Sequence, residues 1–587
     1  MKISSMRILF LLVILVLASV VNAVPADPCV VTMRQPDGTY VNVVLHGDEW
    51  QSFYTTEDGY TIVMNSDGFF VYAFLEKGKL KASQVVAHDA SYRHQAEQSF
   101  LSGVSKYQVP EMTAQTARKR NEIKQKCGIR RCPAPNEPGF LSKTFRGLVI
   151  LVEFNDRKFS RDDSKAIFND IINKENYTGF DEEEYTGSVR DYFYDNSGGK
   201  FSPQFDIYGP YDIDYSQYDA RYEEEGEWQD HYNELAMAAV NAADADVNFQ
   251  DYDGDDDGFV DIVYFIFAGN SSDYSGNDRR LVWPHRSYMV DDSNETEDPI
   301  IKDNVCVFQY VCSAELYGWT HRPASIKMSG IGTMCHEFSH VLGLPDFYDV
   351  NYHSDSHHPG KWSVMATGGS LHYGRTPVGY SLYERWAVGF CDAPEVIAEA
   401  GAYTLHPLAQ KQSGFLINTP VENEYFLLEN RQRGQFKWDA YLPGSGMLVH
   451  HVDWTDSTMW NNNMVNADPE HNCYEVVRAN GVVSSGGSGD DVFPAHGKTS
   501  LTSDTSPAHL RAWNGQGNDY ALTDIQMSGG VISFTVSDNV DHVFPSNSST
   551  SGHIPSAIHY NLGGQPVSES YRGIYLLKGK KYLRWVY

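Results

Sequence analysis

Basic residues, cysteines and long apolar runs are all scarce in this sequence. The 46 Lys and Arg stand against 77 Asp and Glu, a net charge of −31 that argues against nucleic acid and anionic membrane surfaces as partners. Eight cysteines in 587 residues are too few for a disulfide scaffold. After residue 23, no apolar run is long enough to cross a bilayer. What is present is 41% hydrophobic residues, enough for the cores of about three or four domains.

The amino terminus has the pattern of a secretory signal peptide. Lys2 and Arg7 precede the apolar run Ile8–Val21, and small residues follow at Val21–Ala23. A basic start, a short apolar stretch and a small-residue cleavage site are typical of a signal that is removed during export. The pattern predicts a signal peptide at residues 1–23 and a secreted or cell-surface mature chain.

Residues 24–132 precede every catalytic signal in the chain. Asp-Gly pairs at 37–38, 58–59 and 67–68 separate short apolar runs, which is typical of β-hairpins. A basic stretch with Arg118-Lys119-Arg120 follows, and exposed basic connectors invite proteolytic nicking. The sequence therefore predicts a small β-rich unit that ends in a cleavable connector.

The most informative stretch is Gly330–Asp349, which contains the pattern His336-Glu337-x-x-His340. On a helix, residues four apart share one face, so both imidazoles can reach a single metal ion. The opposite face carries an apolar stripe made of Ile331, Met334, Cys335, Phe338, Val341 and Leu342. The pattern predicts a helix with one face toward the core and one face toward a metal.

Gly343 and Pro345 are expected to end this helix and turn the chain back. Asp346 can then lie beneath the metal as a third ligand, which leaves a fourth position for water, as in a catalytic zinc site. Asp349 is also near and is better placed to accept hydrogen bonds around the site. Glu384, on a later predicted helix, is an alternative third ligand.

The string H-E-x-x-H-x-x-G-x-x-D resembles the zinc motif of metzincin proteases, with an aspartate in place of the usual third histidine. The longer string H-E-F-S-H-V-L-G-L-P-D-F-Y-D at 336–349 is similar to the immune inhibitor A family of secreted bacterial metalloproteases. Ser363–Gly369 resembles the metzincin Met-turn, which would place Met365 beneath the zinc. The resemblance implies a zinc endopeptidase that acts on proteins or peptides, with Glu337 activating the zinc-bound water and residues 24–132 acting as a propeptide.

The sequence departs from the metzincin pattern two residues beyond Met365, where many members have a tyrosine and this chain has Thr367. Tyr373 is predicted to stabilise the oxyanion instead, with His372 as an alternative. In some metzincins a propeptide cysteine binds the zinc as a latency switch. Cys127 or Cys132 could do so, or could close a local disulfide, and the surrounding residues do not match the known switch motif.

A second candidate metal site is the pattern D-x-D-x-D-G, which places Asp253, Asp255, Asp257 and Asp261 around a turn. Carboxylates at alternate positions around a glycine direct hard oxygens at one point, as calcium requires. Tyr264 stands where an EF-hand has glutamate, so this is a structural calcium loop outside an EF-hand. The alternative is an acidic surface turn without an ion.

The fold class predicted is α+β, with a metzincin-like zinc protease domain at 144–395 that has a mixed sheet with backing and active-site helices. The run 147–153 suits a strand buried on both faces, and Glu227–Ala243 has helical periodicity. Residues 396–540 alternate short strands with turns, which predicts a β-sandwich without recognisable chemistry of its own. The β-rich propeptide would precede the protease domain.

The last segment, 556–587, contains N-L-G-G-Q-P-V and G-I-Y-L-L-K-G-K-K, which resemble the carboxy-terminal sorting signals of bacterial type IX secretion. That resemblance implies the secretion machinery as a partner; the alternative is a small hairpin. For the whole chain, the competing function is a non-enzymatic secreted binding or adhesion protein with a vestigial zinc site. The intact Glu337 speaks against that alternative.

Overall fold

The structure is a computed structural model of the chain. It describes residues 25–26, 29–48, 51–76, 78–110, 145–224, 227–254, 256–274, 276–291, 298–351, 356–482, 486–538, 559–561, 566–567, 573–577 and 580–584. Several sequence predictions fall outside these residues, namely the signal peptide at 1–23, the basic connector at 118–120, Cys127, Cys132 and Asp255.

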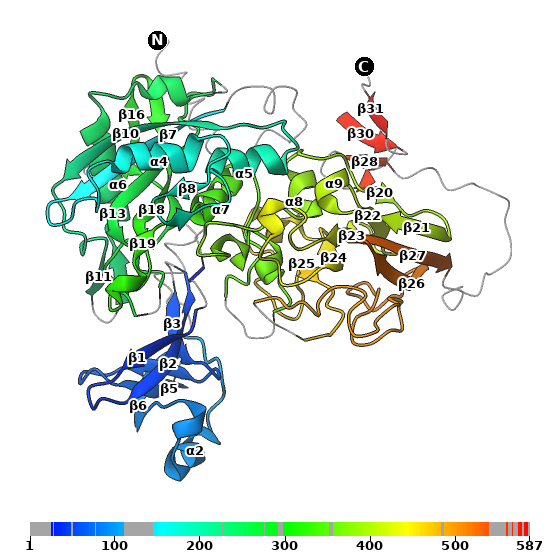
Figure 1. The fold of residues 1–587 in the computed structure, drawn as a ribbon, viewed down its shortest axis with the longest axis horizontal. Coiled ribbons are helices and arrows are strands. Elements are labelled where there is room, and N and C mark those ends of the chain that lie inside the picture. Colours follow the sequence, from blue (N-terminus) through cyan, green and yellow to red (C-terminus); the bar gives the residue numbers. More distant parts are fainter. Residues whose placement is uncertain are drawn as a thin grey trace, which may run out of the picture.

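The amino-terminal unit is an antiparallel meander whose six strands pair in chain order (Figure 1). The elements are β1 (Val31–Arg34), β2 (Tyr40–Gly47), β3 (Ser52–Thr56), β4 (Thr61–Met64), β5 (Phe70–Glu76), β6 (Lys79–Val86), η2 (Ala90–Tyr92) and α2 (Gln95–Leu101). Gly38, Gly59 and Gly68 have positive φ angles at three hairpin turns, which glycine adopts without steric cost. The hairpins therefore form where the Asp-Gly pairs predict them.

A mixed sheet with strand order β10-β7-β13-β18-β14 occupies the centre of the next region. Its strands are β7 (Arg146–Phe154), β10 (Gln204–Ile213), β13 (Val263–Asn270), β14 (His285–Tyr288) and β18 (Gln309–Tyr317), with β19 (Lys327–Met328) paired to β18. The first four strands in this order are parallel and β14 is antiparallel at the edge. β7 is buried from residue 147 to 152, as its continuous apolar run predicts.

Helices cover both faces of this sheet. They are α4 (Ser164–Asn173), α5 (Val189–Asn196), α6 (Tyr232–Ala243) and α7 (Gly332–Val341), and α8 (Leu382–Ala387) follows. Because side chains alternate along a strand, Val149 and Leu151 of β7 pack with α4, α5 and α7, whereas Leu148 and Ile150 pack with α6. The α+β class and the mixed sheet with its helices are thus confirmed.

One predicted helix begins later than its periodicity indicates. Glu227–Asp230 form strand β12, which pairs with β11 (Arg221–Glu224), and α6 starts only at Tyr232. Cross-strand hydrogen bonding therefore overrides the helical pattern of the first turn. The remaining short elements are β8 (Gly179–Phe180), β9 (Glu183–Glu184), η3 (Phe249–Tyr252), β15 (Val290–Asp291), β16 (Asp298–Lys302), β17 (Val305–Val307), η4 (Pro323–Ser325), η5 (Gly360–Trp362) and η6 (Thr367–Ser370).

Beyond residue 394 the chain forms two sheets, with orders β20-β22-β23-β24-β25 and β21-β27-β26. The elements are β20 (Glu395–Val396), β21 (Gly401–Leu405), α9 (Leu408–Lys411), β22 (Phe415–Asn418), β23 (Glu424–Arg431), η7 (Lys437–Asp439), β24 (Gly446–Asp453), α10 (Ser457–Asn461), β25 (Tyr474–Val476), β26 (Tyr520–Ser528) and β27 (Val531–Asp538). Both sheets contribute to one hydrophobic cluster, for example Phe426 from β23 and Phe534 from β27. The name β-sandwich for this region stays a prediction.

The two regions share a core across the predicted boundary at 395/396. The cluster that contains Phe338 of α7 also contains Trp438, Leu448, Trp460 and Tyr474 from the later region. In Figure 1 the helix α8 lies beside the strands of the later region. The later region therefore packs directly against the part of the fold that carries the H-E-x-x-H helix.

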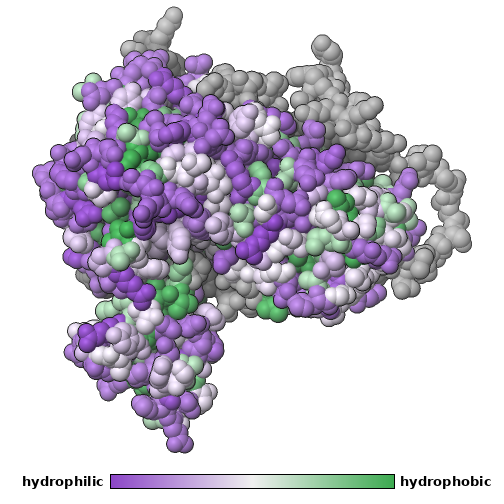
Figure 2. Space-filling view, in the orientation of Figure 1, coloured by the Kyte–Doolittle hydropathy of each residue, from purple (hydrophilic) through white to green (hydrophobic). Residues whose placement is uncertain are grey.

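The carboxy-terminal strands form a sheet with order β29-β28-β30-β31. They are β28 (His559–Asn561), β29 (Pro566–Val567), β30 (Gly573–Leu577) and β31 (Lys580–Arg584). A role in sorting stays a prediction. Among the described residues, no helix has the length and apolar composition needed to span a membrane. Figure 2 shows a largely hydrophilic surface, with hydrophobic residues gathered where the amino-terminal unit meets the central region.

Candidate active site

The helix α7 has the two faces that its sequence predicts. Phe338 packs into the core, with its ring centroid 4.9 Å from those of both Phe145 and Phe193. His336, Glu337 and His340 are also buried, and both imidazoles point toward Asp346 in the chain that follows the helix. Apolar packing therefore fixes the rotation of the helix and, with it, the direction of both imidazoles.

The chain reverses immediately after α7. Gly343 has a φ of 97°, a left-handed conformation that glycine adopts readily. The amide of Gly343 donates to His340 O, and the amide of Leu344 donates to Ser339 O, which closes the helix end. The amide of Phe347 then donates to Met365 O at 2.7 Å, which anchors the returning segment on the Met-turn.

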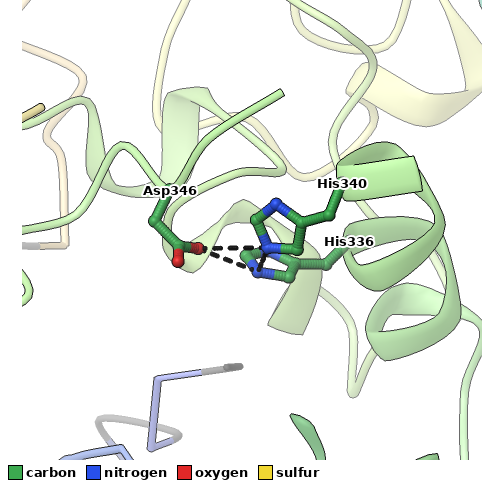
Figure 3. Close-up of side chains that lie close together, drawn as sticks. All are labelled: His336, His340 and Asp346. Carbon is green, nitrogen blue, oxygen red and sulfur yellow. Dashed lines mark hydrogen bonds and ion pairs between the residues drawn. The ribbon is translucent and has the colours of Figure 1, made fainter. Parts of the chain in front are cut away.

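This reversal brings His336, His340 and Asp346 together as one buried group (Figure 3). The Nε2 atoms of the two histidines lie 3.1 Å apart. Asp346 Oδ1 lies 3.1 Å from His336 Nε2 and 3.4 Å from His340 Nε2. Atoms that bind a tetrahedral zinc ion at 2.0–2.1 Å are separated by about 3.3 Å, so these spacings fit zinc.

The hydrogen bonds of the two Nδ1 atoms determine that Nε2 of each histidine faces Asp346. His336 Nδ1 lies 2.8 Å from Val364 O, and His340 Nδ1 lies 2.6 Å from Leu344 O. A carbonyl oxygen only accepts, so each Nδ1 carries a proton and donates, which leaves each Nε2 facing Asp346 and, in the neutral ring, able to bind a metal. Two imidazole nitrogens and a carboxylate oxygen at these distances could hold a metal ion, and the donor set suits zinc.

Glu337 lies on α7 beside this group but is not part of it. Both of its carboxylate oxygens are buried and have no hydrogen-bond partner among the residues that the structure describes. Burial raises the pKa of Glu337 to about 8. A buried carboxylate without a structural partner, next to a group of metal-ligand type, is suited to proton transfer.

The segment that resembles a Met-turn, residues 363–369, is held by buried polar groups. Met365 is fully buried, and its neighbour Ser363 donates through Oγ to Glu384 Oε1. Glu384 also accepts from the amide of Ser381, as part of the capping box of α8. Glu384 is therefore bonded to Ser363 of the Met-turn and is not in the ligand group, so this geometry does not support the alternative with Glu384 as third ligand.

Arg431 ties the later region to the same segment. Its guanidinium donates to Gly379 O at 2.9 Å and to Trp362 O at 3.3 Å, and it pairs with Asp439 at 2.6 Å. All of these groups are buried, so the contacts are shielded from water. The stretch around Arg431, which carries no recognisable chemistry in the sequence, is thus bonded to residues on either side of the Met-turn, Trp362 before it and Gly379 after it.

Tyr373 lines a cavity that His336 and Thr367 also line. Its side chain is 56% exposed, and its ring packs edge-on against Tyr317 at 5.6 Å. His372 is directed elsewhere: its ring stacks on Tyr441 and its Nδ1 lies 3.0 Å from Thr376 Oγ1. Tyr373 thus stays a prediction for oxyanion stabilisation, and its position beside His336 is compatible with that role.

Residues of the amino-terminal unit line this same cavity. Pro25 and Ala26 are both buried there, and Ala26 belongs to a hydrophobic cluster with the central sheet. Two polar contacts also join the unit to the central region: the guanidinium of Arg279 donates to Ser52 Oγ at 2.7 Å, and that of Arg322 donates to Thr32 O at 2.9 Å. The unit is docked against the cavity beside the candidate site.

One functional candidate is invisible to the reasoning from sequence. Asn463 lies 117 residues after Asp346 in the chain, and its side chain contacts both the backbone amide and the carboxylate of Asp346. Asp349, predicted to accept hydrogen bonds around the site, accepts from the amide of Asn351 at 2.8 Å. The only signal for Asn463 in the sequence is the run of three asparagines between Trp460 and Met464, which is unusual beside large apolar residues.

The predicted calcium loop is closed by its own carboxylates in the described residues. Asp253 accepts from the amides of Asp257 and Gly258, and Asp261 accepts from the amide of Gly254. Such contacts shape an acidic turn, with or without an ion. Since Asp255 lies outside the described residues, the calcium site stays a prediction.

Comparison with known proteins matches residues 141–385 to the catalytic domain of the immune inhibitor A peptidase M6 family. The pre-pro-metalloprotease PrtV of Vibrio cholerae is 24% identical over 265 residues, which cover 38% of this chain and 27% of PrtV. Immune inhibitor A of Bacillus thuringiensis subsp. alesti is 23% identical over 274 residues, which cover 40% of this chain and 38% of that protein. The matches thus span less than half of either relative. This part of the chain, residues 141–385, is thus similar to the catalytic domain of the immune inhibitor A family of metallopeptidases.

Proposed function

We propose that the protein is a secreted zinc-dependent endopeptidase that is made as a zymogen and hydrolyses peptide bonds in extracellular proteins. The observation that carries the proposal is the convergence of His336, His340 and Asp346 beside the unpartnered carboxylate of Glu337. A structural zinc site would be closed by four protein ligands, whereas three ligands leave room for water. A vestigial site in an adhesion protein would have no use for a buried, unpartnered glutamate.

His336, His340 and Asp346 would hold the zinc through Nε2, Nε2 and Oδ1. Bound zinc would supply Lewis-acid chemistry at the scissile carbonyl and at a water whose pKa it would lower to about 7. Glu337 accepts the proton of the attacking water and passes it to the leaving amine, so one carboxylate serves first as base and then as acid. Its burial keeps bulk water from competing for that proton.

Tyr373 would donate its phenolic proton toward the oxyanion from the wall of the cavity that His336 lines. Tyr373→Phe is expected to lower kcat with little change in bound zinc, because the phenol contributes only where negative charge develops. Unchanged kcat would assign oxyanion stabilisation to the metal alone.

The amino-terminal unit would act as the inhibitory propeptide. The burial of Pro25 and Ala26 in the cavity beside His336 supports this proposal, since a substrate bound there would have to displace them. We further propose that a signal peptide at 1–23 directs secretion and that the segment at 556–587 directs sorting.

The test of the activity is cleavage of casein or gelatin by the protein after mild proteolytic activation. Cleavage should stop when a zinc chelator is added and return with stoichiometric zinc. Activity that survives complete removal of the metal would refute a metallopeptidase, and binding without cleavage would favour the adhesion alternative.

Calcium is proposed as a structural ion in the loop Asp253–Asp261. An ion that binds only the native state stabilises it by RT ln(1 + [L]/Kd), so the melting temperature should rise with added calcium. The rise should vanish in an Asp253→Asn/Asp261→Asn variant. An identical melting curve for the chelated and calcium-loaded wild type would remove calcium from the proposal.

A further inference from the structure

The carboxylate of Asp346 is clamped by a residue from the later region. Asn463 Nδ2 donates to Asp346 Oδ2 at 2.6 Å, and Asn463 Oδ1 accepts from the amide of Asp346 at 2.6 Å. One asparagine side chain therefore grips both the backbone and the side chain of the same aspartate. All of these groups are buried, so the bonds are protected from water.

The clamp leaves the other carboxylate oxygen for the metal. Asp346 Oδ2 is occupied by Asn463, while Oδ1 lies within 3.4 Å of both histidine Nε2 atoms. A carboxylate held at one oxygen and at its own backbone cannot rotate to present both oxygens. The geometry thus favours binding through a single oxygen in the direction set by Asn463.

The segment that carries Asn463 also contacts residues that follow Asp346. Asn466 Nδ2 donates to Phe347 O at 2.7 Å, and Asn351 Nδ2 donates to Ala467 O at 2.9 Å. The ring of Phe347 packs against Tyr474 at 4.4 Å, at the start of β25. The connection between β24 and β25 therefore holds the returning chain by backbone, side-chain and aromatic contacts.

The backbone of Asn463 explains why an asparagine stands here. Its φ is 51°, in the left-handed region that asparagine, aspartate and glycine tolerate better than other residues. Among residues that accept this conformation, asparagine alone offers one donor and one acceptor at the end of a short side chain. The position requires both the backbone conformation and the two-sided hydrogen bond.

We propose that Asn463 is a positioning residue of the metal site: it fixes the Asp346 carboxylate in the orientation that binds the metal. The functional unit then extends past residue 385, where the family match ends, to include the connection between β24 and β25. The inference rests on the metal binding in the proposed function and needs no peptidase activity.

The test uses the full chain and zinc itself as the probe, in competition with a chromogenic chelator. Asn463→Asp keeps the shape and the tolerated backbone but turns the donor toward Asp346 into an acceptor. Asn463→Gly keeps the left-handed backbone and removes the side chain. Asn472→Ala is the matched control, because Asn472 is also buried in this connection but contacts His357, Ser356 and Asp468 instead of the segment around Asp346.

Both Asn463 variants should bind zinc about 10–100-fold more weakly than the wild type, the usual cost of losing a group that orients a metal ligand. Asn472→Ala should keep the wild-type zinc affinity while lowering the melting temperature of the metal-free protein. At saturating zinc, the activity of Asn463→Gly should largely recover, which loss of fold alone would not allow. Zinc affinity unchanged in both Asn463 variants, or reduced equally in Asn472→Ala, would overturn the inference.

Failure of the clamp and failure of the proposed function are distinguishable. If the wild type binds zinc but cleaves no protein, the endopeptidase proposal fails and the clamp is still measured by zinc affinity. If the Asn463 variants bind zinc as the wild type does and the wild type cleaves casein, only the clamp is wrong.

Discussion

Replacement of Glu337 by glutamine should separate metal binding from catalysis. The amide has nearly the same size and shape as the carboxylate, and the carboxylate oxygens have no hydrogen-bond partner among the described residues. The substitution therefore breaks no contact within the described fold and leaves α7 packed. The ligand atoms come from His336, His340 and Asp346, so zinc should stay bound near stoichiometry.

We expect a large loss of activity because Glu384, the other buried glutamate nearby, cannot replace Glu337 as the general base. A positioned general base contributes about 10²–10⁴ in rate, which corresponds to about 3–5 kcal/mol of barrier. Glu384, another fully buried glutamate of this region, is engaged with Ser363 and Ser381 and cannot take over. We therefore expect kcat to fall toward the upper end of that range, about 10³–10⁴-fold.

The assay measures bound zinc, melting temperature and kcat/KM for a fluorogenic peptide on the same preparation. Glu384→Gln is the matched control: it weakens buried hydrogen bonds at a cost of about 1–3 kcal/mol, so it should melt earlier yet keep its zinc. Wild-type turnover by Glu337→Gln would refute Glu337 as the base. Loss of zinc in Glu384→Gln without unfolding would instead make Glu384 a ligand.

Three further predictions follow from the same geometry. Asp346→Ala should release zinc to a mild chelator while Asp349→Ala keeps it, and the reverse order in a chelator titration would make Asp349 the ligand. Protein that starts at Thr144 should cleave peptides at once, whereas the form that starts at Val24 should be slow until it is nicked; equal initial rates would exclude an inhibitory propeptide. Burial by itself would lower the pKa of His451. Hydrogen bonds and ion pairs with Glu424 at 2.7 Å and Glu475 at 3.4 Å more than offset this and raise the pKa to about 9. Protonated His451 then contributes about 3 kcal/mol to the free energy of unfolding, at about 1.4 kcal/mol per pKa unit. This contribution is complete below pH 6.5 and is lost as the pH rises through 9. The free energies of unfolding of wild type and His451→Gln, measured by denaturant titration, should converge as the pH rises from 6.5 to 9. A constant difference between them from pH 6 to pH 10 would contradict the pKa assigned to His451.

Local pattern alone predicted much of the candidate site. The helical spacing of His336 and His340, the apolar stripe that turns them from the core, and the left-handed Gly343 are properties of about fourteen consecutive residues. The position of Asp346 was predicted in the same way, because a left-handed glycine turns the chain back past the end of the helix. The buried strand β7 was equally evident from its unbroken apolar run.

Only the tertiary structure decided which distant residues complete that site. Asn463 reaches Asp346 across 117 residues of chain, and Pro25 and Ala26 reach the cavity beside His336 from the other end. Arg431, on a strand that shows no chemistry in its sequence, donates to Trp362 and Gly379 on either side of the Met-turn. The physical reason is that periodicity and turn preferences act over a few residues, whereas hydrogen bonds and burial depend on proximity in space. The sequence by itself thus predicted the candidate ligands and the candidate base, and the packing of the later region against α7 determined which distant residues surround them.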